Sequence, residues 1–349
     1  RLEMVREVLN SFNNIEVKEY SGLTIDFAKS IDARVIVRGL RSPADGQYEF
    51  ELASMNKRLA DDIETVFLSS GDQNAFINKL AVDIINKEKV IIGFGAHFIK
   101  NKCHPYLIDL MKYDYITHVV TNGASTIHDF EFGYHGKTEE DVRENLANGT
   151  FGLWETGEHI NKAVNTYTDL GYGKAMGKYI DEERDKSSVW PGSCVSLAWH
   201  CYKRDIPLSI CTSIGHDIIY EHPECDGAKI GEASYIDFLK LAQTMEGIQD
   251  AVFICVGSAI TFPMVMEKAF AMAKNVDPTT GTNCSCYIVD LFDVPGGWGV
   301  GEPAKNDPAY YNRPMKTFSR MVPHCNYMQL DNRQLMYQLR ERLEWIKRL

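Results

Sequence analysis

Five short runs rich in Val, Ile, Leu and Cys recur in the second part of this 349-residue chain, and segments with helical periodicity flank each of them. The runs are KVIIGFG, ITHVVTNG, PLSICTS, AVFICVGS and CSCYIVDLF, at residues 89–95, 116–123, 207–213, 251–258 and 284–292. Strands that are mostly apolar along their length are typical of a parallel sheet covered on both faces. Helices between them imply right-handed crossovers. The sequence therefore predicts an α/β fold, with a parallel Rossmann-like sheet and helices on both faces.

A smaller unit with the same alternation precedes this sheet. Its expected strands and helices are residues 15–20, 23–31, 34–39, 48–59 and 63–70. The polar stretch SSGDQN at 69–74 is rich in turn-forming residues. We therefore expect two domains, a small incomplete α/β unit at 1–72 and a main domain at 73–349. Because the chain opens inside an amphipathic helical pattern, we also expect a segment before Arg1.

Glycine follows three of the predicted strands, in IIGFGAH, VVTNGAS and FICVGSA. Gly95, Gly123 and Gly257 each come just before a predicted helix, where glycine lets the backbone approach a ligand closely. The amides and dipole at a helix N-terminus favour phosphate. Three such turns at one sheet edge predict a dinucleotide crevice. Turns that serve packing alone remain an alternative, because no complete GxGxxG motif is present.

The formal net charge of −11 argues against nucleic acid and anionic membranes as partners. No apolar run reaches the ~20 residues of a membrane helix, and no signal peptide opens the chain, so we expect a cytoplasmic protein. The nine cysteines form neither a disulfide framework nor a CxxC pair, which favours reduced thiols.

Five carboxylates and two histidines gather between residues 216 and 232. They are His216, Asp217, Glu221, His222, Glu224, Asp226 and Glu232. Separated carboxylates complement a ligand that carries several ammonium groups. A metal site and a solvated acidic loop are the alternatives. We favour a cationic ligand, held by Asp217, Asp226 and Glu232, and expect no metal.

Three segments resemble the bacterial branch of the deoxyhypusine synthase family. They are GFGAHFIKNKCHPYLIDLM, THVVTNGASTIHDFEFGYHGKTEEDV and IGHDIIYEHPECDGAKIGEAS, within residues 88–330. The resemblance implies a Rossmann-like fold, a homotetramer, NAD and a polyamine such as spermidine. It further implies hydride transfer to NAD and movement of an aminobutyl group to an acceptor amine. A small acceptor, as in homospermidine formation, is favoured.

The resemblance also assigns site residues. Those near the cofactor are Gly95, Asn122, Gly123, Asp129, Gly257 and Ser258, with His128 and Asp217 as catalytic residues. Asp129 has a second interpretation as a helix cap. Asp226, Glu232, Asp293 and Trp298 are expected to contact the substrate.

One position departs from the family pattern. The family carries an imine-forming lysine directly after a Trp-Gly pair, whereas GGWGVGEPAK places Val300 there. Valine has no amine for covalent catalysis, so Lys305 or Lys316 would have to substitute. We take Lys305 as the candidate. A non-catalytic NAD-binding homologue therefore remains an alternative.

The segment IVRGLRSPADGQYEFELASMNKRLADDIETVFL resembles phosphopantetheine adenylyltransferase, an enzyme of coenzyme A biosynthesis. The resemblance implies a nucleotide site in which Arg38 and Arg41 approach phosphates and Glu49 lies beside the nucleotide. The planar guanidinium of arginine suits phosphate oxygens. The family's HxGH motif is absent from this chain. We expect a truncated unit with weak adenylyl transfer, although this activity remains an alternative function.

Overall fold

The computed structural model describes residues 6, 16–40, 43–69, 72–138, 141–152, 155–184, 195–292 and 304–347. The chain divides into two compact units, Arg1–Lys79 with Leu343–Leu349, and Leu80–Arg342. The division falls within helix α4 (Asp72–Asn86), whereas the expected domain boundary at residue 72 lies at the start of this helix. The two-domain assignment at that boundary stays a prediction.

The first unit contains a two-stranded parallel sheet. Its elements are α2 (Thr24–Ser30), β1 (Val35–Leu40), α3 (Pro43–Leu59) and β2 (Glu64–Ser69). β1 pairs with β2 in register from Val35 opposite Glu64 to Leu40 opposite Ser69. A small apolar core joins Ile25 of α2 to Ile36 of β1. The strand expected at 15–20 was wrong for residues 16–20, which are largely exposed and pair with no strand.

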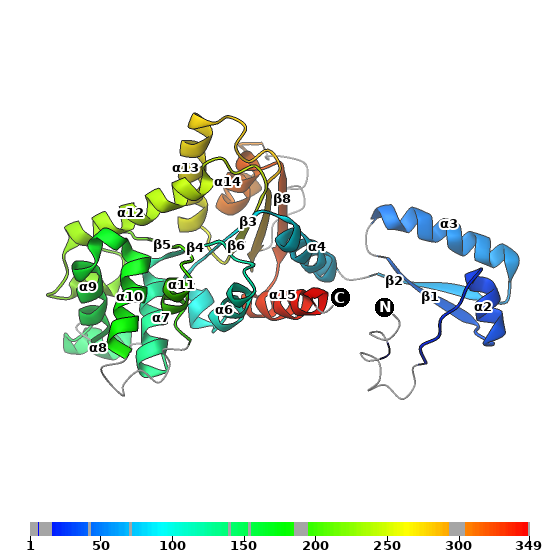
Figure 1. Ribbon diagram of the computed structural model, residues 1–349, viewed down its shortest axis with the longest axis horizontal. Coiled ribbons are helices and arrows are strands. Elements are labelled where there is room, and N and C mark those ends of the chain that lie inside the picture. Colours follow the sequence, from blue (N-terminus) through cyan, green and yellow to red (C-terminus); the bar gives the residue numbers. More distant parts are fainter. Residues whose placement is uncertain are drawn as a thin grey trace. The chain divides into compact units, whose positions relative to one another are not determined.

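The second unit is built on a six-stranded parallel sheet (Figure 1). Its strands are β3 (Lys89–Phe94), β4 (His118–Asn122), β5 (Leu208–Cys211), β6 (Ala251–Val256), β7 (Ser285–Asp290) and β8 (His324–Gln329). They lie in the order β5-β4-β3-β6-β7-β8, and every pairing is parallel. This is the doubly wound order in which the chain turns back between the first strand, β3, and the fourth, β6. The predicted α/β fold is therefore confirmed.

Helices connect and cover these strands. The first half contains α5 (Ala96–Lys100), α6 (His104–Lys112), α7 (Gly123–His135), α8 (Val142–Asn148), α9 (Glu155–Thr166), η1 (Thr168–Leu170), α10 (Tyr172–Arg184) and α11 (Leu197–Lys203). The second half contains η3 (Ile218–Glu221), α12 (Gly227–Met245), α13 (Thr261–Val276), η5 (Pro308–Tyr311), α14 (Arg313–Met321) and α15 (Asn332–Lys347).

Opposite faces of the sheet carry different helices. On one face Leu241 of α12, Phe262 of α13 and Phe318 of α14 form one apolar cluster with Phe253 and Ile288 of the strands. Burial of each such side chain stabilises the fold by roughly 1.5–3 kcal/mol. Helices α6 and α15 lie on the other side of the sheet from α13 and α14 (Figure 1). This two-sided cover explains why the central strands are apolar throughout.

The sixth strand, β8, was not predicted. Its sequence HCNYMQ is polar, and its residues are half-buried or exposed. As an edge strand it pairs with β7 alone and does not need the continuous apolar run of a central strand. Within the described part of the chain, no helix is both long enough and apolar enough to span a membrane.

Candidate functional site

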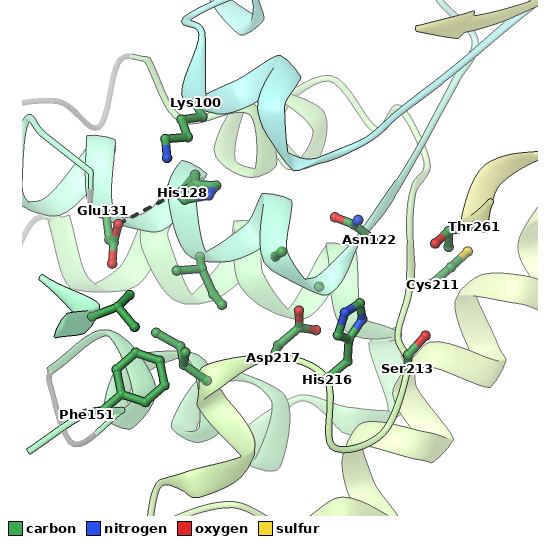
Figure 2. A pocket seen from close by; sticks show the side chains of 15 residues that line it. Lys100, Asn122, His128, Glu131, Phe151, Cys211, Ser213, His216, Asp217 and Thr261 are labelled. Atoms are coloured by element: carbon green, nitrogen blue, oxygen red, sulfur yellow. Dashed lines mark ion pairs between the residues drawn. The ribbon is translucent and has the colours of Figure 1, made fainter. Parts of the chain in front are cut away.

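A cavity of about 500 Å³ opens at the carboxyl edge of the sheet, beyond β4 and β5 (Figure 2). Open α/β sheets bind their ligands at this edge, near the point where the strand order reverses. Segments that follow four strands contribute to it: α5 after β3, α7 after β4, the loop after β5, and the start of α13 after β6. The lining residues are Lys100, Asn122, Gly123, Ala124, Ile127, His128, Glu131, Val142, Phe151, Cys211, Ser213, His216, Asp217, Ile218 and Thr261.

One end of the cavity is formed by the N-terminus of α7 and the carboxylate of Asp217. Asn122 caps α7 by accepting a hydrogen bond from the Ser125 amide at 3.0 Å. Gly123 is the first residue of the helix, and a Cβ atom there would stand 2.2 Å from Asp217 Oδ2. The carboxylate therefore occupies the space that the missing side chain leaves.

The Asp217 carboxylate is partly shielded from water. Burial raises its pKa, and the neighbouring His216 opposes this shift. Among the described residues, none donates a hydrogen bond to this carboxylate. A partly buried carboxylate with no donor favours a cationic ligand, because an ammonium group supplies both charge and hydrogen bonds.

A hydrogen-bonded group of side chains lies farther along the cavity wall, where Figure 2 shows His128 and Glu131 on α7. Glu131 is buried, and it accepts hydrogen bonds from Thr138 at 2.5 Å and from Thr156 at 3.2 Å. His128 Nδ1 lies 2.5 Å from the same Thr138 hydroxyl and 3.9 Å from Glu131 Oε2. The cavity thus has a buried carboxylate that contacts its histidine mainly through a threonine.

Sequence reasoning identified His128 but missed Glu131, Thr138 and Lys100. Glu131 carried a readable signal, because it follows His128 by three positions and so shares its helix face. Thr138 lies beyond the end of α7, and Lys100 comes from a different element, so neither could be placed by helical spacing.

The predicted glycine turns differ in role. Gly95 and Gly257 lie close together where the strand order reverses, and a Cβ atom on Gly95 would stand 2.7 Å from the Gly257 carbonyl oxygen. Gly257 has a φ of +57°, which favours glycine, and the space around its Cβ position is open. Ser258 Oγ accepts a hydrogen bond from the Phe262 amide and so stabilises the start of α13. None of the three lines the cavity, and their cofactor contacts stay predictions.

Asp129 lies at the N-terminus of α11. Its carboxylate accepts hydrogen bonds from Ser196 Oγ at 2.9 Å, the Leu197 amide at 2.6 Å and the Ala198 amide at 3.0 Å, at the start of α11. Burial raises its pKa from 3.8 to about 6, although these hydrogen bonds act in the opposite direction. The structure therefore shows Asp129 as a helix cap, the second of the two interpretations, and it does not line the cavity.

The acidic cluster does not assemble around the cavity. Of its members only His216 and Asp217 line the cavity. Asp226 caps α12 by accepting hydrogen bonds from two amides, and Glu232 is exposed. No group of three His, Cys, Asp or Glu side chains in the described ranges is placed to hold a metal ion.

The remaining predicted substrate and lysine positions lie elsewhere. Asp293, Trp298 and Val300 fall outside the described residues. Lys305 is exposed and does not line the cavity. The Lys316 ammonium stacks on the ring of Tyr310, 3.5 Å from its centroid.

In the first unit the structure joins two of the three predicted nucleotide residues. Arg38 on β1 donates to Glu49 on α3 through two hydrogen bonds, at 2.6 and 2.8 Å. Arg38 is therefore held in a bidentate ion pair with Glu49 and is not a charge that only water contacts. Arg41 falls outside the described residues.

The strand order defines a doubly wound α/β protein with its cavity at the expected edge. No protein-family model matches the chain. Phosphopantetheine adenylyltransferase of Nitrosomonas eutropha is 46% identical over 112 residues, which are 32% of this chain and 64% of that protein. The chain thus spans less than two thirds of this curated relative.

The chain also resembles two solved structures. The complex of AgrE with ornithine and NAD⁺ has a TM-score of 0.50 at 13% identity, over 82% of this chain and 35% of that one. A candidate deoxyhypusine synthase from Entamoeba histolytica has a TM-score of 0.43 at 9% identity, and the match covers 85% of this chain and 93% of that one. The likeness to AgrE concerns the fold alone.

Proposed function

We propose that the second unit is an NAD-dependent enzyme that oxidises an amine, with the ammonium group of the substrate held by Asp217. The observation that carries this proposal is the partly buried Asp217 carboxylate, which receives no hydrogen bond from the described residues and faces a cavity at the carboxyl edge of the sheet. Such a group selects a cation over a neutral ligand of the same shape.

The residues present fit a dinucleotide. The strand order reverses between β3 and β6, and the space beside Gly257 at this reversal is open. Gly95, Asn122, Gly123, Gly257 and Ser258 would face the cofactor. The solved complex of AgrE contains NAD⁺ together with ornithine, which supports a nicotinamide cofactor and an amine-bearing substrate for this fold. When bound, NAD⁺ would accept a hydride from the carbon that carries the amine.

The substrate in this proposal is a polyamine such as spermidine, and the oxidised amine passes an aminobutyl group to a small amine acceptor. Within the cavity, Asp217 fixes the reacting nitrogen, and the wall formed by Ile127 and Phe151 contacts the methylene chain. A homotetramer belongs to the same proposal. Asp226 and Glu232 do not line the cavity, so the proposal assigns binding of the amine to Asp217.

Incubation with NAD⁺ and spermidine, followed by mass spectrometry for released diaminopropane, tests the reaction. We expect Asp217→Asn to weaken the free energy of spermidine binding by about 1.5–3 kcal/mol and to leave the affinity for NAD⁺ unchanged. Glu232→Gln is the matched control, because it removes an exposed carboxylate of the same cluster. Equal affinities of both variants for spermidine would refute the assignment of Asp217.

Borohydride reduction in the presence of NAD⁺ and spermidine tests the covalent route. An imine on a lysine would become a stable mass increase on one peptide. Because Lys305 is exposed and does not line the cavity, we expect diaminopropane release without an adduct on Lys305. An adduct there would show that the enzyme transfers the aminobutyl group through this lysine.

Phosphopantetheine adenylyltransferase is the second candidate function, supported by the 46% identity to the Nitrosomonas eutropha enzyme. In this proposal Arg38 and Arg41 would bind phosphates. The test is pyrophosphate release from ATP in the presence of phosphopantetheine. Release that is unaffected by Arg38→Met would exclude the assigned site.

A further inference from the structure

Two cysteines face each other at one edge of the large sheet. Cys286 of β7 and Cys325 of β8 are partners in the parallel pairing of these strands. Side chains at paired positions of neighbouring parallel strands point to the same face of the sheet. Both cysteines accordingly contact the apolar cluster between the sheet and helices α13 and α14. Cys286 is a buried member of this cluster, and Cys325 is a half-buried neighbour.

The spacing of the two strands suits a disulfide. Neighbouring strands lie about 4.8 Å apart, and the Cα atoms of bonded cysteines are roughly 4.4–6.8 Å apart. The two thiols also interact directly, through a hydrogen bond between the side chains of Cys286 and Cys325. A bond between their sulfur atoms therefore requires no large movement of the backbone.

The other cysteines of the described residues are arranged differently. Among these residues, no second pair of cysteines occupies facing positions of neighbouring strands. Cys255 belongs to the same apolar cluster, but its thiol donates to the Ser258 carbonyl at 3.4 Å. The Cys284 thiol is directed to the Gln249 carbonyl at 3.9 Å. The facing positions thus distinguish Cys286 and Cys325 as a dithiol.

We propose that Cys286 and Cys325 are a modification site, at which hydrogen peroxide produces a reversible disulfide between β7 and β8. Burial raises the pKa of the Cys286 thiol well above its usual range, so the half-buried Cys325 reacts first. Its thiolate attacks one oxygen of the peroxide, the O–O bond breaks, and the product is a sulfenic acid and water. The Cys286 sulfur then displaces the sulfenic oxygen, which leaves as water with the Cys286 proton. Two thiols are oxidised to one disulfide, and one peroxide is reduced to two water molecules.

The disulfide attaches the edge strand to the buried part of the sheet. β8 pairs with β7 alone, and its residues are half-buried or exposed. Such a strand opens at a lower free energy than the buried strands. A covalent bond to the buried Cys286 opposes this local opening. Neither cysteine lines the cavity, so this inference is independent of the proposed function.

The test uses the whole protein, purified under reducing conditions and then treated with hydrogen peroxide. Remaining thiols are blocked with N-ethylmaleimide before digestion without reductant, and mass spectrometry identifies the peptides. We expect two peptides joined through Cys286 and Cys325, which separate when dithiothreitol is added. The oxidised protein should migrate as a single chain on a non-reducing denaturing gel. A link between two copies of the chain, or oxidation that leaves both thiols free for the maleimide, would overturn the inference.

Variants of the two cysteines separate the steps. Cys325→Ser should give no linked peptides. In Cys286→Ala the sulfenic acid on Cys325 has no facing thiol, so it should accumulate and react with dimedone. Cys225→Ser is the matched control, because Cys225 is also half-buried, and it should form the link as the wild-type protein does. Absence of the dimedone adduct on Cys325 in Cys286→Ala would show that the order of reaction is wrong.

Hydrogen exchange measures the effect on the sheet. We expect the amides of β8 to exchange roughly ten-fold or more slowly after oxidation. The amides of β5, at the opposite edge of the sheet, should be unchanged. Cys325→Ser treated with peroxide should show no slowing. Equal exchange of β8 in the reduced and the disulfide-linked wild-type protein would refute the effect on the edge strand.

Discussion

The carboxylate of Asp217 lies directly against Gly123, the first residue of α7, where any larger residue would place a Cβ atom 2.2 Å from Asp217 Oδ2. The partial positive charge at a helix N-terminus favours an anion in this position. Burial acts in the other direction and raises the pKa of Asp217. Gly123, which sequence analysis assigned to the approach of the cofactor, thus also makes room for the Asp217 carboxylate.

Gly123→Ala should displace Asp217 and leave the fold intact. The added Cβ meets the end of a side chain that is able to move, and alanine is a better helix former than glycine. We expect spermidine affinity to fall by about ten-fold, as measured by calorimetry, with an unchanged circular dichroism spectrum. Gly231→Ala in α12 is the control, since its Cβ meets nothing within 4 Å. A greater loss of NAD⁺ affinity than of spermidine affinity would assign Gly123 to the cofactor alone.

Much of the fold could be predicted because its central strands consist mostly of apolar residues. AVFICV of β6 is buried at every position. A continuous apolar run of this kind indicates a strand that is covered on both faces of the sheet. The edge strand HCNYMQ gave no such signal, because its stability comes from pairing with β7 and not from burial of an apolar run. Edge strands depend on tertiary context, which a local pattern does not contain.

The candidate site could be predicted only in part. Asn122, Gly123 and His128 were found because they follow one strand closely, and the ends of parallel strands meet at one edge. Asp129 is adjacent to His128 in sequence, yet it points to α11, because successive residues of a helix face different directions. Sequence proximity in the acidic cluster was similarly misleading, because Asp226 caps α12 and does not line the cavity.

Asp129 should make the stability of the protein depend on pH. Its pKa is raised from 3.8 to about 6, so the folded state retains a proton that the unfolded state releases between these values. The stabilisation is complete below the lower pKa and is lost as the pH rises through the upper one. Between about pH 4 and about pH 7, the free energy of unfolding of the wild-type protein should fall by roughly 3 kcal/mol relative to that of Asp129→Asn. Urea unfolding at both pH values measures this difference, and a wild-type protein that gains stability would contradict it.

The Arg38–Glu49 pair should stabilise the first unit more than the exposed ion pair Lys57–Glu64 of the same unit. The guanidinium makes two hydrogen bonds, and the Glu49 side chain is 16% exposed. Lys57 and Glu64 are 46% and 66% exposed. We expect coupling free energies of about 1 kcal/mol or more for the first pair and below about 0.5 kcal/mol for the second. Double-mutant cycles read by hydrogen exchange of the β1 and β2 amides provide the comparison, and equal couplings would show that geometry contributes nothing.

Asp226→Asn should leave amine binding unchanged, because the Asp226 carboxylate caps α12 outside the cavity. Asparagine is about as good an N-cap as aspartate, so this variant removes the charge and keeps the helix start. We expect a change in spermidine affinity below about 0.5 kcal/mol, against the larger loss in Asp217→Asn. Asp226→Ala, which removes the cap itself, should lower the free energy of unfolding by about 1 kcal/mol with the same unchanged affinity. A loss of 1.5 kcal/mol or more of spermidine binding in Asp226→Asn, roughly the value of a desolvated charged contact, would place the distal amine of the substrate on Asp226 after all.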